Sequence, residues 1–237
     1  MTAAVLQGKH QIVAARDALR RMGASCIAPW PVPWLRRLGI LGGVNLGDPV
    51  KSWDILTSAT FFMERIPREA PVLDIGAYAS EILCVLHRLG YRSLTGIDLN
   101  PGIREMPHSE AIRYEVADFL QAPFRDGAFG AVTAISVIEH GLDAHRLLGE
   151  ISRLLRPGGY FVASFDYWPE KIDTDGVKIF GMDWTIFSRE EVLGFIEKAA
   201  NHGLVPVGEI ALDSGDRVVN WGGRSYTFGW LALQKKT

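Results

Sequence analysis

Residues 71–101 read PVLDIGAYASEILCVLHRLGYRSLTGIDLNP, and this stretch decides the fold. The apolar run of Val72, Leu73 and Ile75 is too short for a helix and suits a strand buried on both faces of a parallel sheet. A helix is predicted over 81–89, and a second apolar run over 94–97 predicts the next strand. Because parallel strands joined by a helix need a right-handed crossover, we expect a βαβ unit with a ligand site beyond the carboxyl ends of its strands.

An acidic residue marks the carboxyl end of each of these two predicted strands. Asp74 lies near the end of the first strand, and Asp98 follows the second. A carboxylate at the tip of the second strand is placed to accept hydrogen bonds from the hydroxyl groups of a ribose. Gly76 permits a sharp backbone turn directly after the first strand. The unit therefore predicts a nucleoside-binding site, without indicating which nucleoside.

Two segments of this stretch, VLDIGAYASEIL and TGIDLNP, resemble the start of a class I S-adenosylmethionine-dependent methyltransferase. That family usually carries Gly-x-Gly-x-Gly after its first acidic residue, whereas this chain keeps Gly76 but has Tyr78 and Ser80 at the two later positions. LLRPGGYFVAS at 154–164 resembles the family's connection into its fifth strand. The resemblance implies a doubly wound, Rossmann-like α/β domain with a mostly parallel seven-stranded sheet and an antiparallel last strand. The remaining strands are then expected over 112–116, 129–136, 160–165, 204–212 and 226–233.

The resemblance also implies S-adenosylmethionine as the cofactor. The first turn would face its methionine part, Asp98 its ribose, and Asp118 with Phe119 its adenine. An alternative for the last pair is an aspartate that caps a helix before a core phenylalanine. The full set of implied contacts is Asp74, Gly76, Ala77, Tyr78, Asp98, Leu99, Asp118, Phe119 and Ser136.

A Glu139-His140 pair follows the predicted fourth strand, and in the resembling family this end faces the methyl group and the acceptor. A neutral imidazole there can take a proton from a hydroxyl acceptor near neutral pH. We therefore predict that His140 is the catalytic base, with Asp166 and Asp173 as rivals. The alternative for His140 is a structural role, in which it bonds a backbone carbonyl beside the cofactor.

The segment DYWPEKIDTD at 166–175 leaves the predicted fifth strand and overhangs the same cleft. Aromatic faces beside carboxylates suit a sugar or a polyol-like acceptor. We predict that the acceptor is bound by Trp53, Tyr167, Trp168 and Trp184. The expected reaction is O-methylation of a small hydroxylated acceptor, such as a sugar or glycan precursor. The alternatives are a phenol, an acid or an amine as acceptor, or a non-catalytic Rossmann-like domain that has lost tight cofactor binding.

The composition excludes several other classes of function. A net charge of −2 over 237 residues gives no argument for a nucleic acid or an anionic membrane as partner, although local basic patches are compatible with it. Cys26 and Cys84 form neither a disulfide framework nor a zinc motif, and the carboxylates show no spacing diagnostic of a metal site. Without a membrane-spanning run or a visible secretory signal, we expect a cytoplasmic protein.

Residues 1–50 are predicted to be an N-terminal extension, and residues 51–237 the methyltransferase domain. The extension contains an expected amphipathic helix over 11–22 and the segment APWPVPW at 28–34, where alternate prolines favour extended backbone. This segment is either a lid or substrate wall, or an arm that packs on the domain or on a second subunit of a homodimer. In the resembling family, residues 51–54 would face the entrance of the cleft.

Overall fold

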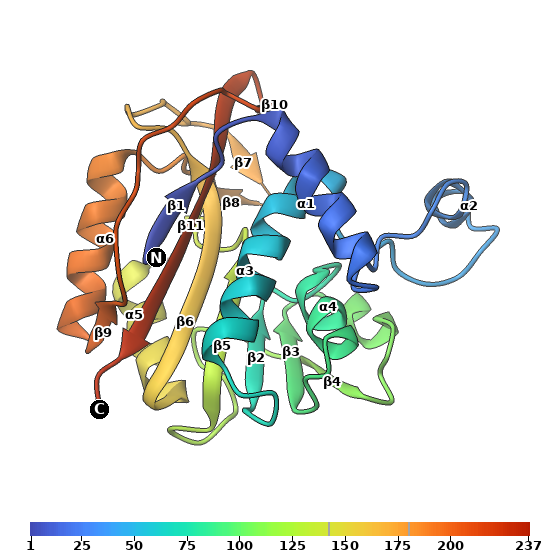
Figure 1. The fold of residues 1–237 in the computed structure, drawn as a ribbon, viewed down its shortest axis with the longest axis horizontal. Helices are drawn as coiled ribbons and strands as arrows, with labels where there is room; N and C mark the ends of the chain where they lie inside the picture. Colours follow the sequence, from blue (N-terminus) through green and yellow to red (C-terminus); the bar gives the residue numbers. More distant parts are fainter. Residues whose placement is uncertain (142, 180) are drawn as a thin grey trace.

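The computed structural model describes residues 1–141, 143–179 and 181–237. Figure 1 shows a central twisted sheet with helices on both faces. The helices are α1 (Lys9–Arg21), α2 (Val32–Arg37), α3 (Ser52–Arg65), α4 (Ile82–Arg88), α5 (Ala144–Leu154) and α6 (Arg189–Asn201), with the short 3₁₀ turns η1 (Pro49–Lys51) and η2 (Pro101–Glu105).

The main sheet has the order β1-β11-β6-β5-β2-β3-β4. Strands β2 to β6 run parallel to one another, and β11 is antiparallel to β6, so the predicted mostly parallel α/β fold is confirmed. The strands of the main sheet are β1 (Ala3–Val5), β2 (Val72–Ile75), β3 (Leu94–Asp98), β4 (Ile112–Val116), β5 (Phe129–Ile135), β6 (Leu155–Tyr167), β9 (Leu204–Pro206), β10 (Val219–Trp221) and β11 (Arg224–Lys235). A separate two-stranded ribbon consists of β7 (Lys178–Ile179) and β8 (Met182–Asp183).

The main sheet has more strands than the seven predicted, because the described residues form nine, and the difference lies at its outer edge. The strand expected over 204–212 ends at Pro206, whose nitrogen cannot donate to a ladder. This short β9 pairs only with residues 233–235 of β11, and β1 pairs with residues 229–231 of the same strand. The first residues of the chain therefore complete the sheet, while the predicted domain boundary at residue 50 stays a prediction.

Alternation along β2 explains why apolar residues occur on both of its faces. Val72 points into the core on the α3 and α4 side of the sheet, and Leu73 into the core on the α5 and α6 side. Both side chains are 0% exposed. Successive residues of a strand face opposite sides, so a strand covered by helices on both sides needs apolar residues throughout.

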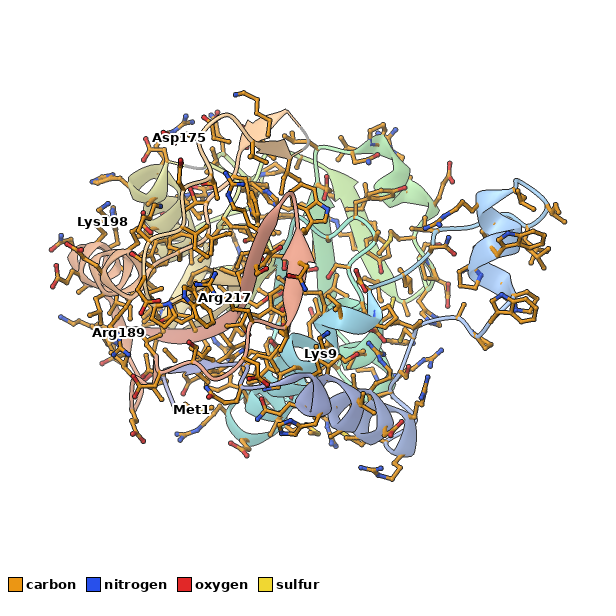
Figure 2. All side chains as sticks on the ribbon, turned by 90° about the horizontal axis from the view of Figure 1, so that it is seen from above. Met1, Lys9, Asp175, Arg189, Lys198 and Arg217 are labelled. Atoms are coloured by element: carbon orange, nitrogen blue, oxygen red, sulfur yellow. The ribbon has the colours of Figure 1, made fainter. Side chains whose placement is uncertain are left out.

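The proline-rich segment forms an arm, defined here as residues 28–45. It contains a cis Trp30–Pro31 peptide bond and the helix α2, so the prediction of extended backbone is wrong for 32–37. Pro33 lies in the first turn of α2, where the missing N–H would have no helical partner in any case. Figure 1 shows α2 standing away from the body, and Figure 2 shows it at the opposite end of the long axis from the labelled Arg189 and Lys198.

Two glycines test the packing described, and the first of them, Gly229, is the cross-strand neighbour of Phe165 in β6. A methyl group added at Gly229 of β11 would lie 2.5 Å from Cε2 of Phe165, whereas one added at Gly194 of α6 would meet nothing within 4 Å. Gly229→Ala should therefore lower the free energy of unfolding by roughly 1–3 kcal/mol, because a buried ring must move. Gly194→Ala is the matched control and should raise it by up to about 1 kcal/mol. Urea unfolding of both variants measures this, and equal effects would contradict the packing described.

Candidate active site

The first candidate region is the turn between β2 and α4. Gly76 has φ 68°, and a methyl group added there would lie 2.6 Å from Cγ2 of Val137. The N–H of the buried Ala77 donates to the Ile97 carbonyl at 3.1 Å. The turn is thus tied to β3 and brought close to the segment after β5, where only glycine fits at position 76.

The carboxylate of Asp98 lies half-buried at the tip of β3. Its Oδ2 accepts the backbone N–H of Tyr78 at 3.0 Å, and its Oδ1 accepts that of Asn100 at 2.8 Å. Each oxygen keeps a second lone pair, so the group can still accept ribose hydroxyls. The ring of Tyr78 lies against Gly102, where an added methyl group would be 2.8 Å from Cε2 of the ring. The residue that replaces the family's second glycine therefore packs on the loop after β3.

The other predicted cofactor contacts include Leu99, after β3, and the adenine pair Asp118 and Phe119, after β4. Leu99 is 62% exposed, Asp118 is exposed, and Phe119 packs partly buried against the core. Oδ1 of Asp118 accepts the N–H of Leu120 at 2.8 Å, so this residue caps its own turn. The hydroxyl oxygen of Ser136 is buried without a hydrogen-bond partner in the described part of the chain, whereas the Ser80 hydroxyl interacts with Asp74. An orphaned polar atom of this kind beside an exposed apolar surface fits an adenosyl group with a polar amino-acid tail.

Asp74 occupies a different position from the one predicted. Its side chain is 0% exposed, and the Thr133 hydroxyl donates to its Oδ1 at 2.6 Å. Burial raises the pKa of Asp74 to about 7, against the lowering effect of the Thr133 hydrogen bond. In this structure the Asp74 side chain is buried next to the turn, and it offers no exposed oxygen to the methionine part of a cofactor.

An ion pair that the sequence analysis missed holds this turn to the N-terminal segment. Nη1 and Nη2 of Arg16 each lie 2.8 Å from an oxygen of Glu81, and Arg16 also donates to the Ser52 hydroxyl at 2.9 Å. Glu81 Oε1 accepts the N–H of Cys26 at 2.7 Å. The signal in the sequence is an arginine on the otherwise apolar buried side of α1, where a charge needs a partner.

The second candidate region is a group of charged side chains at the carboxyl ends of β5 and β6, called here the Lys51 cluster: Lys51, Asp54, Glu139 and Asp166. Lys51 Nζ lies 3.7 Å from Asp54 Oδ2 and 3.6 Å from Asp166 Oδ1, and 3.3 Å from the centre of the Phe228 ring. Asp54 and Glu139 are at most 1% exposed, and Asp166 is 6% exposed. Trp184 Nε1 donates to Asp166 Oδ2 at 2.8 Å.

Burial controls the protonation of these groups. It raises the pKa of Asp54 to about 6, although Lys51 opposes this rise. Burial also raises the pKa of Glu139 well above its usual range, and the charge of Asp166 adds to this effect. The pKa of the neighbouring His140 is lowered, chiefly by burial. The imidazole is therefore neutral at pH 7, and the cluster holds protons that exposed carboxyl groups would have released.

The structure brings some predicted acceptor residues to this cluster and leaves others away from it. His140 directly follows Glu139, Trp53 lies half-buried between Lys51 and Asp54 in the chain, and Trp184 contacts Asp166 through its N–H. Sequence reasoning placed residues 51–54 at the entrance but gave Lys51, Asp54 and Glu139 no role. The signal was present as a lysine and an aspartate one turn apart at the start of a helix.

Four predicted residues do not present themselves to an acceptor as expected. Tyr167 is 0% exposed and donates its hydroxyl to the Leu212 carbonyl at 2.6 Å, so its ring has no free face for stacking. Trp168 is half-buried with the Arg217 guanidinium 4.0 Å from its ring centre. Asp173 is exposed, and its Oδ1 accepts the N–H of Asp175 at 2.9 Å. Trp184, only 2% exposed, positions Asp166 and does not offer a ring face.

Known proteins resemble the part of this chain that contains β2 to β6. A family model described as a methyltransferase domain matches residues 73–163. Residues 73–163 are therefore similar to a methyltransferase domain, and the match bears out the predicted resemblance to S-adenosylmethionine-dependent methyltransferases for that segment. Within the described residues, no group of three or more His, Cys, Asp or Glu side chains is arranged to hold a metal ion.

Individual relatives of this methyltransferase domain differ in their named substrates. An uncharacterized methyltransferase of Mycobacterium sp. (strain KMS) is 32% identical over 134 residues, which cover 51% of this chain and 52% of that protein. A demethylmenaquinone methyltransferase of Thermus thermophilus is 31% identical over 107 residues, covering 42% of this chain and 48% of that protein. The chain thus spans about half the length of the curated relatives it matches. The solved geranyl diphosphate C-methyltransferase of Streptomyces coelicolor A3(2) has the same fold, with a TM-score of 0.57, 22% identity and coverage of 82% of this chain and 91% of that one.

The buried carboxyl group of Asp74 gives a stability prediction. Because its pKa in the folded protein is raised from 3.8 to about 7, its stabilising contribution is full below pH 3.8 and is lost as the pH rises through 7. Asp74→Asn keeps an oxygen for the Thr133 hydroxyl and cannot ionise. Relative to the unmodified protein, this variant should gain roughly 2–4 kcal/mol of unfolding free energy between pH 4 and pH 8.

Urea unfolding at several pH values measures this difference. Asp118→Asn, at an exposed carboxylate, is the control and should show little change. A difference for Asp74→Asn that is independent of pH would contradict the buried, protonated carboxyl group.

Proposed function

We propose that this protein transfers the methyl group of S-adenosylmethionine to a hydroxyl group of a small hydroxylated acceptor, with a sugar or glycan precursor as the first candidate. The observation that supports this proposal is the Lys51 cluster. Glu139 Oε2 is buried without a hydrogen-bond partner in the described part of the chain, and Lys51 Nζ is buried with only ion-pair contacts, at 3.6 and 3.7 Å. Buried polar atoms normally have partners, so unpartnered ones indicate where a polar ligand binds.

The mixture of donors and acceptors favours hydroxyl groups on that ligand. An ammonium group only donates, an ionised carboxylate only accepts, and the Ser164 hydroxyl, which interacts with Asp54, does both. A polyol can satisfy all three kinds of group, because each hydroxyl both donates and accepts. A protonated amine would only donate and would meet the charge of Lys51. An apolar ring would leave the cluster unsatisfied, at a cost of roughly 1–3 kcal/mol for each group.

The relatives are compatible with a different acceptor. The Thermus protein is named for demethylmenaquinone and the Streptomyces protein for geranyl diphosphate, and the latter is a C-methyltransferase. C-methylation of an unsaturated acceptor is therefore the second candidate. The Lys51 cluster favours the hydroxylated acceptor, because neither an apolar quinone ring nor an anionic diphosphate is complementary to a site with three carboxyl groups and one lysine.

The chain's own residues supply alignment and proton removal. S-adenosylmethionine, when bound, supplies a methyl group on a sulfonium whose positive charge makes the sulfide a good leaving group. Asp98 would hold the ribose, while Leu99 and Phe119 would pack on the adenine. The neutral imidazole of His140 can take the acceptor proton, and Asp166 is oriented for the same task by Trp184. Lys51 can stabilise the negative charge that develops on the acceptor oxygen.

Cofactor binding is the first test. Calorimetry with S-adenosylhomocysteine should give a 1:1 complex, and Asp98→Asn should weaken it by about tenfold, because a charged acceptor of hydrogen bonds becomes neutral. Asp17→Asn, at an exposed carboxylate on α1, is the matched control and should bind like the unmodified protein. Absence of binding by the unmodified protein would favour the non-catalytic domain.

The role of His140 is the second test. With its pKa lowered, kcat for methyl transfer to a hydroxylated acceptor should rise with pH through an apparent pKa below the ordinary 6.5. His140→Ala should lower kcat by about 10²–10⁴-fold and leave the affinity for S-adenosylhomocysteine nearly unchanged. Unchanged turnover would assign the base to Asp166, which Asp166→Asn then tests.

The acceptor class is decided by a screen with labelled cofactor. Sugars and nucleotide sugars form one pool, and phenols, amines and prenyl compounds form the others. Labelling only in the last three pools would contradict a hydroxylated sugar-like acceptor.

A further inference from the structure

The arm at 28–45 exposes more apolar side chain than a free protein surface normally does. Its large apolar residues at the surface are Trp30, 85% exposed, Ile40, 64%, Trp34 and Leu38, 54% each, and Leu41, 42%. All five lie within twelve residues of one another in the sequence. In both views the arm projects clear of the body (Figures 1 and 2).

The charge of this region is entirely positive. Between Asp17 and Asp48 the sequence contains no acidic residue and four arginines: Arg20, Arg21, Arg36 and Arg37. Arg36 donates to the carbonyls of Gly42 and Val44, at 3.2 and 3.0 Å, and no carboxylate pairs with it among the described residues. The whole chain has a net charge of −2, so this positive charge is local.

The arm is a formed loop with two fixed ends. At its start, the N–H of Cys26 donates to Glu81, and just beyond its end the N–H of Gly47 donates to the Ala79 carbonyl at 2.8 Å. Within it, the side-chain amide of Asn45 donates to the Pro33 carbonyl at 3.1 Å. Both ends are thus attached to the turn between β2 and α4. The arm therefore has a fixed position in which its apolar side chains stay exposed to solvent.

We infer that the arm docks this protein on an anionic lipid surface. Tryptophan side chains are enriched at the boundary between head groups and acyl chains, where an apolar ring and a polar N–H are both accommodated. Leucine and isoleucine beside them can enter the acyl region, and the arginines match anionic head groups. No described helix is long and apolar enough to cross a membrane, so the contact is peripheral.

A second copy of the chain fits these observations less well. In a two-fold contact between arms, each patch would face its own copy, which would bring the uncompensated Arg36 and Arg37 of both copies together. Like charges brought together in this way weaken association. The inference also revises the expectation of no membrane partner, which rested on the charge of the whole chain and not on its distribution.

The test is co-sedimentation with vesicles of phosphatidylcholine alone or mixed with phosphatidylglycerol. The full chain should bind the anionic vesicles and bind the neutral ones at least tenfold more weakly. W30A/W34A should lose at least tenfold of the affinity, and Arg37→Gln about fivefold. The matched controls are Trp221→Ala, at a tryptophan 47% exposed on β10, and Arg65→Gln, at the end of α3, which should both bind like the unmodified chain.

Thermal unfolding of each variant shows whether the fold is intact, and sedimentation velocity reports on self-association. Equal binding to neutral and anionic vesicles, or full binding by W30A/W34A, would overturn the inference. So would a dimer of the unmodified chain that becomes monomeric in W30A/W34A while neither protein binds vesicles. That result would assign the arm to a second copy.

Discussion

One ammonium group, Lys51 Nζ, lies among three carboxyl groups that the fold has removed from water. A site with three buried carboxyl groups cannot be fully ionised, because the free-energy cost of desolvating three carboxylates exceeds their electrostatic stabilisation by one lysine. Protons therefore stay on Asp54 and Glu139 at pH values where exposed carboxyl groups have lost them. The parallel sheet imposes this arrangement, since the ends of β5 and β6 and the start of α3 meet at one edge.

The same edge carries the cofactor turn, and the N-terminal segment joins the two regions. Arg16 holds Glu81 beside the turn with two hydrogen bonds and reaches Ser52, next to Lys51, with a third. A buried guanidinium that loses one of these partners is left with unsatisfied donors, so the three positions are coupled. A segment that looks like an appendage in the sequence therefore orders both halves of the site, and it also carries the exposed arm.

The sequence allowed the fold to be predicted because its signals are local. The short apolar run before Gly76 and the acidic residue after the second run give a βαβ unit without any knowledge of distant contacts. The edge of the sheet could not be predicted, since pairing of β1 with β11 joins the two ends of the chain. Tyr167 illustrates the limit at the site, because alternation along β6 turned its ring into the core while Asp166, one residue earlier, faces Lys51.

The proposed function requires that the Lys51 cluster lies within reach of the transferred methyl group. A crystal structure with S-adenosylhomocysteine and a hydroxylated acceptor measures this distance. We expect the open side of the sulfur to face His140 and the acceptor hydroxyls to hydrogen-bond to Lys51 and Asp166. A sulfur directed toward another surface, with the Lys51 cluster closed and free of ligand, would contradict it.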